Sequence, residues 1–344
     1  MSEAQPGEAA LREALCAQLA TTIADTALPG LRTVHHGKVR DSYLLPDGRR
    51  LIVTTDRVSA FDQILGTLPC KGQVLNQLAA HWFRRSAHVA PNHLLSTPDP
   101  NLMVVRDCQP LPVELVMRGY LTGVTSTSIW VAYQRGERRF AGHDLPEGLR
   151  KNEPLPRPLL TPSTKAEKGG HDETLSADEI LSRGLLDEAT LSAASALCQR
   201  LFAFGQAEAR ARGLILADTK YELGRARSAD SREELLVIDE IHTPDSSRYW
   251  FAEDYEARLS RGEEPRALDK EYLRRYLVSV GYRGEGPPPP LPDDVRVEAS
   301  CRYIEALQLL TGAPFAPVLG DATARLAHAA AALCQDQPGQ EAVS

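Results

Sequence analysis

The segment from Leu214 to Gly224, LILADTKYELG, constrains this chain more than any other, because an apolar run changes there into alternating polar residues. The apolar start predicts a β-strand, and side chains at every second position of a strand share one face. Asp218, Lys220 and Glu222 therefore project together. Two carboxylates beside an ammonium make a poor core, but Mg²⁺ prefers carboxylate and phosphate oxygens, and a lysine neutralises a transferring phosphoryl group. The segment favours a metal–phosphate site.

A second predicted strand, Leu235 to Ile241, carries the acidic pair Asp239 and Glu240 near its end. If the two strands pair antiparallel, one of these acids lies beside Glu222. We expect this acid to be Asp239, with Glu240 facing away or fixing a loop. The alternative is a surface hairpin with solvated charges. The apolar runs on both strands imply burial and argue against that alternative.

Three further segments place cations beside glycines or turns. In GKVRD, Gly37 to Asp41, backbone amides and Lys38 could cradle a phosphate. A plain turn with exposed charges explains this motif as well. TDRVSAFD, Thr55 to Asp62, and the pair Lys71-Gly72 before a predicted helix offer anion contacts at a helix N-terminus, or only caps and turns.

Two more segments carry arginines that suit phosphate. In PLPVELVMRGYLTG, Pro110 to Gly123, an apolar strand leads to Arg118. Backbone of this type can bind an adenine edge between two lobes, and Arg118 offers a planar fork for phosphate; an ordinary interdomain crossover fits equally well. In PDSSR, Asp245 and Arg248 lie three positions apart in a turn, which a salt bridge alone would also explain.

Bulk composition limits the class of protein. The 344 residues suggest one large or two moderate domains, and 39 Lys and Arg against 46 Asp and Glu give a formal charge of −7, which argues against general nucleic-acid binding. The six cysteines are scattered, without zinc-ligand spacing, so reduced thiols are expected. The N-terminus does not resemble a leader, and no run of about eighteen apolar residues occurs. We therefore expect a cytoplasmic protein that does not enter a membrane.

Periodicity and turn signals outline the organisation. We expect a β-rich N-terminal lobe with a leading helix over residues 1–117, a larger α+β lobe over 118–285, and a linker, helix and tail over 286–344. The proline-rich stretch Pro154 to Pro162 precedes a polar run that is typical of an exposed loop. Ser176 and Glu179 form a predicted capping box. Helices are expected over 8–25, 72–85, 189–212 and 295–310, and strands over 38–45, 50–55, 102–107 and 113–117.

Taken in order, the motifs form a recognisable set. GKVRDSY, TDRVSAFD, ELVMRGYLTG, TPSTKAEKGGHDE, LADTKYELG and IDEIHTPDSSRYW resemble the SAICAR synthetase family, over about Gly37 to Gly312. The resemblance implies an α+β fold of two lobes with an ATP cleft between them. It also implies an ATP- and Mg²⁺-dependent carbon–nitrogen ligase that joins L-aspartate to the carboxylate of the nucleotide CAIR, with these small molecules as its partners.

The resemblance also implies roles for individual residues. Lys220 would lie beside the transferring group, with Asp218 as a second catalytic residue, and Glu222 and Asp239 would bind magnesium and with it ATP. Further ATP contacts would come from Lys38, Arg40 and the strand around Glu114 and Val116. The substrates would be held by Arg118, Lys165, His171, Asp172, Asp245 and Arg248, with the arginines at the CAIR phosphate and the loop from Ser163 to Asp172 closing over aspartate.

Two other functions use the same residues. A kinase-like phosphotransferase acting on a small alcohol would need the carboxylates and Lys220 but no aspartate. A non-catalytic module that senses ATP would bind nucleotide without turnover, and it would leave the row of charges around Asp218, Lys220 and Glu222 without a purpose.

Overall fold

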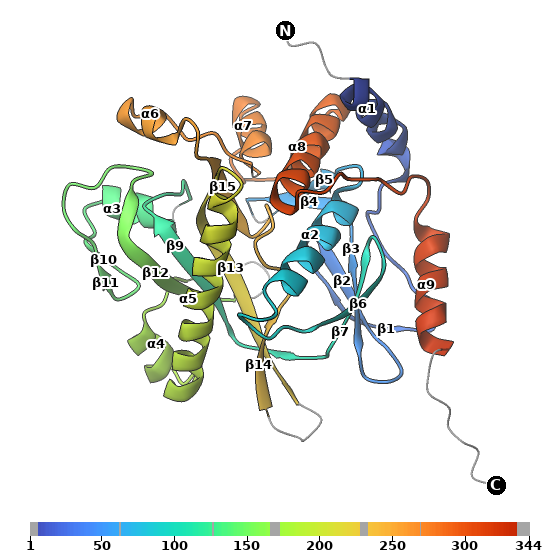
Figure 1. Cartoon of the computed structure of the whole chain (residues 1–344), viewed down its shortest axis with the longest axis horizontal. Coiled ribbons are helices and arrows are strands. Elements are labelled where there is room, and N and C mark those ends of the chain that lie inside the picture. Colours follow the sequence, from blue (N-terminus) through green and yellow to red (C-terminus); the bar gives the residue numbers. More distant parts are fainter. Residues whose placement is uncertain are drawn as a thin grey trace. The chain divides into compact units, whose positions relative to one another are not determined.

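The computed structural model (Figure 1) describes residues 6–61, 63–125, 127–165, 173–227, 233–268 and 270–335. These residues fall into two compact units, one of residues 1–81, 94–107 and 269–344 and one of residues 82–93 and 108–268. The sequence suggested three consecutive segments instead. The units are discontinuous because residues 94–105 form strands that join the N-terminal sheet, and because the helix Asp293–Thr311 packs on the first helix, Pro6–Gln18.

The second unit is built around a six-stranded sheet whose centre is β13, Leu214–Arg227. The main order is β12-β9-β13-β14, and β13 pairs antiparallel with β14, Glu233–Ile238, with Glu222 opposite Ile238, which meets the condition on which the placement of Asp239 depended. β13 also pairs with β9, Val113–Tyr120, and with β15, Ser247–Phe251. β14 ends at Ile238, so Asp239 and Glu240 lie in the turn after the strand.

The two faces of this sheet differ, as the alternation in β13 predicts. Ala217, Thr219 and Tyr221 are almost fully buried, and the long helix α5, Glu188–Arg210, covers their face. In β9, a Cβ atom added at Gly119 would lie 3.0 Å from Gln206 Nε2 of α5, so this side of β9 also faces the helix. The charged residues of β13 and β9 consequently occupy the opposite face.

The edge strand β12, Pro154–Thr164, is the main element that the sequence did not predict. Proline lacks a backbone N–H and is confined to strand edges or bulges. Both conditions hold here, because β9 is the only named strand of the described residues that pairs with β12, and the register shifts between Pro154 and Leu159. The proline-rich stretch therefore forms a sheet edge and delivers the residues after Pro162 next to Glu114 and Val113 of β9.

The first unit contains a five-stranded antiparallel sheet of order β1-β2-β3-β7-β6. The predicted hairpin is confirmed as β2, Arg40–Leu44, and β3, Arg50–Thr54, and α9, Thr323–Gln335, supplies Leu326 and Ala330 to the core against this sheet. Its other elements are α1 Pro6–Gln18, the short 3-10 helix Leu19–Thr21, β1 Arg32–His36, β4 Arg57–Ala60, β5 Gln63–Thr67, β6 Leu94–Asp99, β7 Leu102–Val105, α7 Glu271–Ser279 and α8 Asp293–Thr311.

The remaining elements complete the second unit or connect the two. Helix α2, Lys71–Arg85, agrees with the predicted helix and runs across the boundary between the units. The others are β8 Gln109–Pro110, α3 Ile129–Gln134, β10 Arg139–Phe140, β11 His143–Asp144, α4 Ala177–Ser182 and α6 Tyr255–Ser260. Ser176 and Glu179 form the predicted capping box on α4. Helices and strands together confirm the α+β class, and none of the described helices has the length and apolarity needed to cross a membrane.

On the face of the sheet that α5 covers, His242 is buried against this helix. Its Nε2 lies 2.5 Å from the hydroxyl of Tyr221, and the hydroxyl of Tyr249 donates to its carbonyl oxygen at 2.9 Å. The ring also meets Trp82 edge-on, with centroids 4.9 Å apart. A Cβ atom at Gly205 would lie 2.4 Å from the imidazole, so the helix can pass His242 only with glycine at this position.

The contact between α5 and His242 yields a stability prediction for G205A. Alanine favours helix over glycine by about 1 kcal/mol, so propensity alone would stabilise the variant. Because the added methyl overlaps the ring, we expect a net loss of about 2 kcal/mol in the free energy of unfolding, measured by denaturant titration. Ser192→Ala, an exposed position on the same helix, is the control and should change stability little. A stabilised G205A would contradict this account.

Candidate functional site

Charged side chains from four strands meet on the face of the six-stranded sheet that α5 leaves uncovered. At their centre is Lys220, whose Nζ lies 2.7 Å from Glu114 Oε1 and 2.7 Å from Glu222 Oε1. Burial lowers the pKa of Lys220, but the carboxylates of Glu222, Glu114 and Asp239 raise it by more, so the pKa lies above its ordinary value. The ammonium therefore stays charged at neutral pH.

Glu222 is held by two lysines. Lys165, at the end of β12, donates to Glu222 Oε2 at 2.7 Å, while Lys220 takes the other oxygen. Only 18% of the Glu222 side chain is exposed. Burial raises the pKa of this carboxyl, but the two ammonium groups outweigh that effect and lower it to about 2. Glu222 is thus a fully ionised carboxylate at the surface of the sheet.

Asp239 follows β14 directly and lies close enough to Lys220 to raise the pKa of that lysine. Its backbone is left-handed, with a φ of 62°, which is uncommon for a residue with a side chain. The turn is fixed by Glu240, which is buried and accepts a hydrogen bond from the hydroxyl of Thr243. Glu240 therefore fixes the turn, as the sequence suggested, while Asp239 joins the charged face.

A second cluster lies next to the first, at Asp218. Its carboxylate binds Arg248 of β15 and lies 3.7 Å from Arg118 Nη1 of β9, the residues that flank it in the sheet register. Thr161 of β12 accepts a hydrogen bond of 2.8 Å from Arg118 Nε. Burial lowers the pKa of Arg118 to about 10, with Asp218 opposing this shift, so the guanidinium remains protonated at neutral pH.

Other predicted site residues of this unit take different positions. Val116 lies inside the sheet, with β12 on one side and β13 on the other, so its backbone groups face neighbouring strands. The adenine contact expected for the backbone around Glu114 and Val116 stays a prediction. Asp245 is half-buried, and its N–H donates to Thr243 Oγ1 at 3.3 Å in the turn before β15. His171 and Asp172 lie outside the described residues.

Lys38 and Arg40 belong to the first unit, where Lys38 lies in the tight turn before β2 and Arg40 begins the strand. Gly37 N–H donates to the Arg40 carbonyl at 2.8 Å, and Arg57 Nη2 donates to the Gly37 carbonyl at 2.9 Å. Arg57 also binds Asp41 Oδ1 at 2.6 Å. The GKVRD and TDRVSAFD motifs are thus parts of one buried network that fixes this turn and leaves the Lys38 side chain exposed.

The carboxylates of the charged face fit a hard divalent cation. Within the described part of the chain, no group of three or more His, Cys, Asp or Glu side chains forms a ready-made cage. Mg²⁺ is usually bound through only one or two carboxylates, with phosphates and water completing its shell. An ionised Glu222, with Asp239 beside Lys220, supplies that donor set.

The sequence did not predict Thr161, although it orients the Arg118 guanidinium. Its only available signal was its position in a proline-rich stretch that resembles a loop. Once β12 is known to pair with β9, the register Leu159↔Arg118 and Thr161↔Val116 places Thr161 on the charged face beside Arg118.

Comparison with known proteins gives consistent matches. A sequence model of the SAICAR synthetase family matches residues 33–289. A putative phosphoribosylaminoimidazole-succinocarboxamide synthase 2 of Mesorhizobium japonicum is 48% identical over 302 residues, covering 88% of this chain and 95% of that protein. A phosphoribosylaminoimidazole-succinocarboxamide synthase of Legionella pneumophila is 43% identical over 295 residues, covering 85% and 92%.

A similar solved structure is that of the SAICAR-synthase from Saccharomyces cerevisiae complexed with SAICAR. It aligns with a TM-score of 0.73 and 31% identity, covering 86% of this chain and 100% of the yeast chain. The alignment therefore extends over nearly all of both chains.

The low pKa of Glu222 predicts how stability depends on pH. Because this pKa is about 2 in the folded chain against 4.5 for an ordinary glutamate, the carboxylate stabilises the fold fully above pH 4.5. This contribution is lost as the pH falls from 4.5 towards 2. In denaturant titrations, the stability difference between wild type and Glu222→Gln should shrink across that window. A difference that does not change with pH there would contradict the ion pairs.

Proposed function

Because the chain belongs to the SAICAR synthetase family and is a ligase of purine biosynthesis, we propose that it joins the carboxylate of CAIR to the amine of L-aspartate, converting ATP to ADP and phosphate. The observation that carries this proposal is the charged face, on which Lys220 lies between Glu114 and Glu222 and next to the Arg118–Asp218–Arg248 cluster. Acidic groups for a metal and arginines for a phosphate thus occur side by side on one sheet.

A carboxylate is a poor electrophile, so we propose two steps. An oxygen of the CAIR carboxylate attacks the γ-phosphorus of ATP, and ADP leaves with the pair of electrons of the broken P–O bond. The amine of aspartate then attacks the carbon of the resulting acyl phosphate, a proton leaves the nitrogen, and phosphate departs. The protein mainly positions the reactants and neutralises their charge.

The proposed ATP contacts follow the motifs of the family. Lys38 and Arg40 would contact the phosphates of ATP, and the hydrogen bonds at Gly37 support this role because they fix the turn that presents the exposed Lys38 side chain. Glu222 and Asp239 would hold Mg²⁺, which supplies positive charge to the phosphate oxygens when bound. Glu114 would act through its side chain by fixing Lys220. The backbone around Glu114 and Val116 would contact adenine.

Lys220 would act beside the transferring phosphoryl group, because its charge is retained and its position is fixed from two sides. Asp218 would act by holding the two arginines that flank it. Arg118 and Arg248 would bind the phosphate of CAIR, since guanidinium groups pair with phosphate in a fork geometry.

The remaining substrate contacts would come from the turn before β15 and the end of β12. Asp245 would contact CAIR, and Lys165, already beside Glu222, would face the reacting carboxylate. His171 and Asp172 stay sequence-based proposals for the aspartate side. The yeast relative, which is described as a complex with SAICAR, supports this choice of reaction. A cytoplasmic location is part of the same proposal, because the relatives bear the names of metabolic enzymes.

The proposed reaction predicts phosphate release that requires aspartate. Purified protein would be given ATP, Mg²⁺ and CAIR, with L-aspartate present or omitted, while phosphate and the ultraviolet change of the imidazole product are followed. We expect release only with aspartate and in step with product. ATP consumption without aspartate would favour a phosphotransferase, and nucleotide binding without any turnover would favour a sensor.

If Glu222 and Asp239 bind the metal, substitution of either residue should reduce turnover. Glu222→Gln and Asp239→Asn keep the shape of each side chain but remove its charge, so we expect kcat to fall by at least about 100-fold at fixed Mg²⁺. Glu256→Gln removes one charge from an exposed position on α6 and should leave kcat unchanged. Circular dichroism would check that each variant is folded. Near-normal turnover in either site variant would break the assignment.

A further inference from the structure

Arg118 depends on more than its ion pair for its orientation. Arg248 binds the carboxylate of Asp218 directly, whereas Arg118 Nη1 lies 3.7 Å from that carboxylate, beyond the length of a normal hydrogen bond. The carboxylate therefore attracts the Arg118 guanidinium without fixing the direction of its N–H groups. Only 13% of the Arg118 side chain is exposed, so a ligand can reach the guanidinium over a small part of its surface.

The β10–β11 hairpin, residues 139–144, packs against β12 beside this arginine. Its turn residues Ala141 and Gly142 have φ angles of 49° and 82°, the positive values that a tight two-residue turn requires. Phe140 and His143 lie opposite each other in its register, so their side chains share one face of the hairpin. Each of these two residues makes a contact that leads to Arg118.

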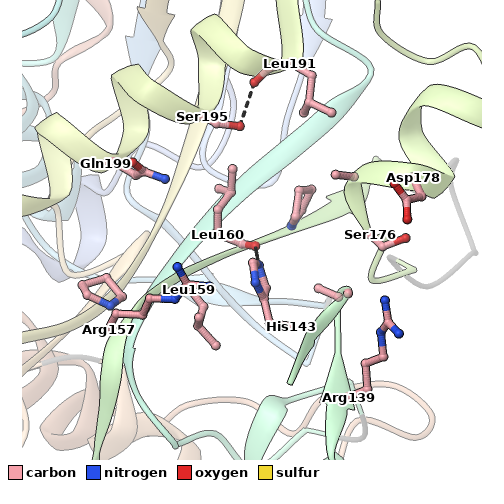
Figure 2. Close-up of a pocket in the computed structure, with 15 residues that line it drawn as sticks. Arg139, His143, Arg157, Leu159, Leu160, Ser176, Asp178, Leu191, Ser195 and Gln199 are labelled. Carbon is pink, nitrogen blue, oxygen red and sulfur yellow. Dashed lines mark hydrogen bonds between the residues drawn. The ribbon is translucent and has the colours of Figure 1, made fainter. Parts of the chain in front are cut away.

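His143 fixes the backbone of β12. Its Nε2 lies 2.7 Å from the carbonyl oxygen of Leu160, and since a carbonyl can only accept, this nitrogen carries the proton and donates. Figure 2 shows the bond, at the side of a cavity of about 330 Å³ that both residues line. Because the ring borders this open space, the hydrogen bond sets its direction, rather than close packing on every side.

The residue after Leu160 is Thr161, which binds Arg118. Its Oγ1 accepts a hydrogen bond of 2.8 Å from Arg118 Nε and donates one of 3.2 Å to the carbonyl oxygen of Val116. A shift of β12 at Leu160 would move this hydroxyl and turn the guanidinium with it. His143 therefore acts on the orientation of Arg118 through Leu160 and Thr161.

Phe140 contacts the same guanidinium directly. The central carbon of the Arg118 guanidinium lies 5.9 Å from the centroid of the Phe140 ring, within the range in which an aromatic ring attracts a cation. Phe140 is buried in an apolar cluster that includes Leu159, the residue opposite Arg118 in the register of β12 and β9. This packing holds the ring in place beside the guanidinium.

From these contacts we propose that Phe140 and His143 are positioning residues for the phosphate of CAIR. They orient the Arg118 guanidinium, and they do not touch the reacting atoms. The inference rests on the proposed function, in which Arg118 binds this phosphate. A guanidinium binds phosphate best through two parallel N–H bonds, so a change in its orientation weakens CAIR binding and leaves ATP binding and the chemical steps unchanged.

Four single variants of the full chain test the proposal in assays that vary CAIR, ATP and L-aspartate separately. His143→Phe keeps an aromatic ring but removes the N–H donor, whereas His143→Gln keeps an N–H donor at a similar distance from the backbone. Phe140→Leu removes the ring beside the guanidinium. Leu145→Val, a buried position of the same apolar cluster, is the control for lost packing.

We expect His143→Phe and Phe140→Leu each to raise KM for CAIR by about three- to tenfold, with kcat and KM for ATP unchanged. His143→Gln and Leu145→Val should stay close to wild type. In an Arg118→Lys background, the first two substitutions should have no further effect, because the guanidinium that they orient is gone. An unchanged KM for CAIR in His143→Phe and Phe140→Leu, or an equal rise in the Arg118→Lys background, would overturn the proposal.

Calorimetric titration with ribose 5-phosphate separates this inference from the ligase reaction, because it needs no turnover. Wild type without aspartate-dependent turnover would refute the reaction, while the titration would still test the orientation of Arg118. Weaker binding of ribose 5-phosphate by His143→Phe than by His143→Gln would support the positioning role. Equal binding by the two variants, or no binding by the wild type, would overturn it.

Discussion

The ion pairs of Lys220 with Glu114 and Glu222 are the constraint around which the functional face is arranged. Partly buried charges are costly unless each has partners, and removing one partner leaves the others uncompensated. The sheet meets this requirement by bringing three strands together, so that β9 supplies Glu114, β13 supplies Lys220 and Glu222, and the end of β12 supplies Lys165. The positions of these three strands are therefore coupled to the same few charges.

The charged face divides into two halves of opposite excess charge. Around Lys220, the three carboxylates of Glu114, Glu222 and Asp239 outnumber the two lysines, which leaves a place for a cation. Around Asp218, two arginines share one carboxylate, which leaves a place for an anion. Because Asp218 and Glu222 lie on one strand with Lys220 between them, this division follows directly from the alternation in β13.

The sequence predicted the parts of this site that depend on local pattern. Alternation identified the common face of Asp218, Lys220 and Glu222, and the turn signal identified the β2–β3 hairpin. The sequence alone did not show which distant segments pair with each other. Because proline-rich stretches resemble loops, β12 was missed, and with it the Lys165–Glu222 pair. Asp239 was placed in a strand because its left-handed backbone, set by the turn around Glu240, has no sequence signal.

Contacts on the apolar side of the sheet fix the backbone of the turn that carries two of the acidic residues proposed for the site. Asp239 and Asp245 lie in a turn with left-handed residues at Asp239 and His242, a conformation that persists only when its surroundings enforce it. His242 holds this turn in place from the side of the sheet that faces α5. It is hydrogen-bonded to Tyr221 and Tyr249, and its ring packs against Gly205 of α5. Burial lowers the pKa of His242 to about 3, so the imidazole remains neutral near pH 7 and holds the turn without adding a charge that would compete with Lys220.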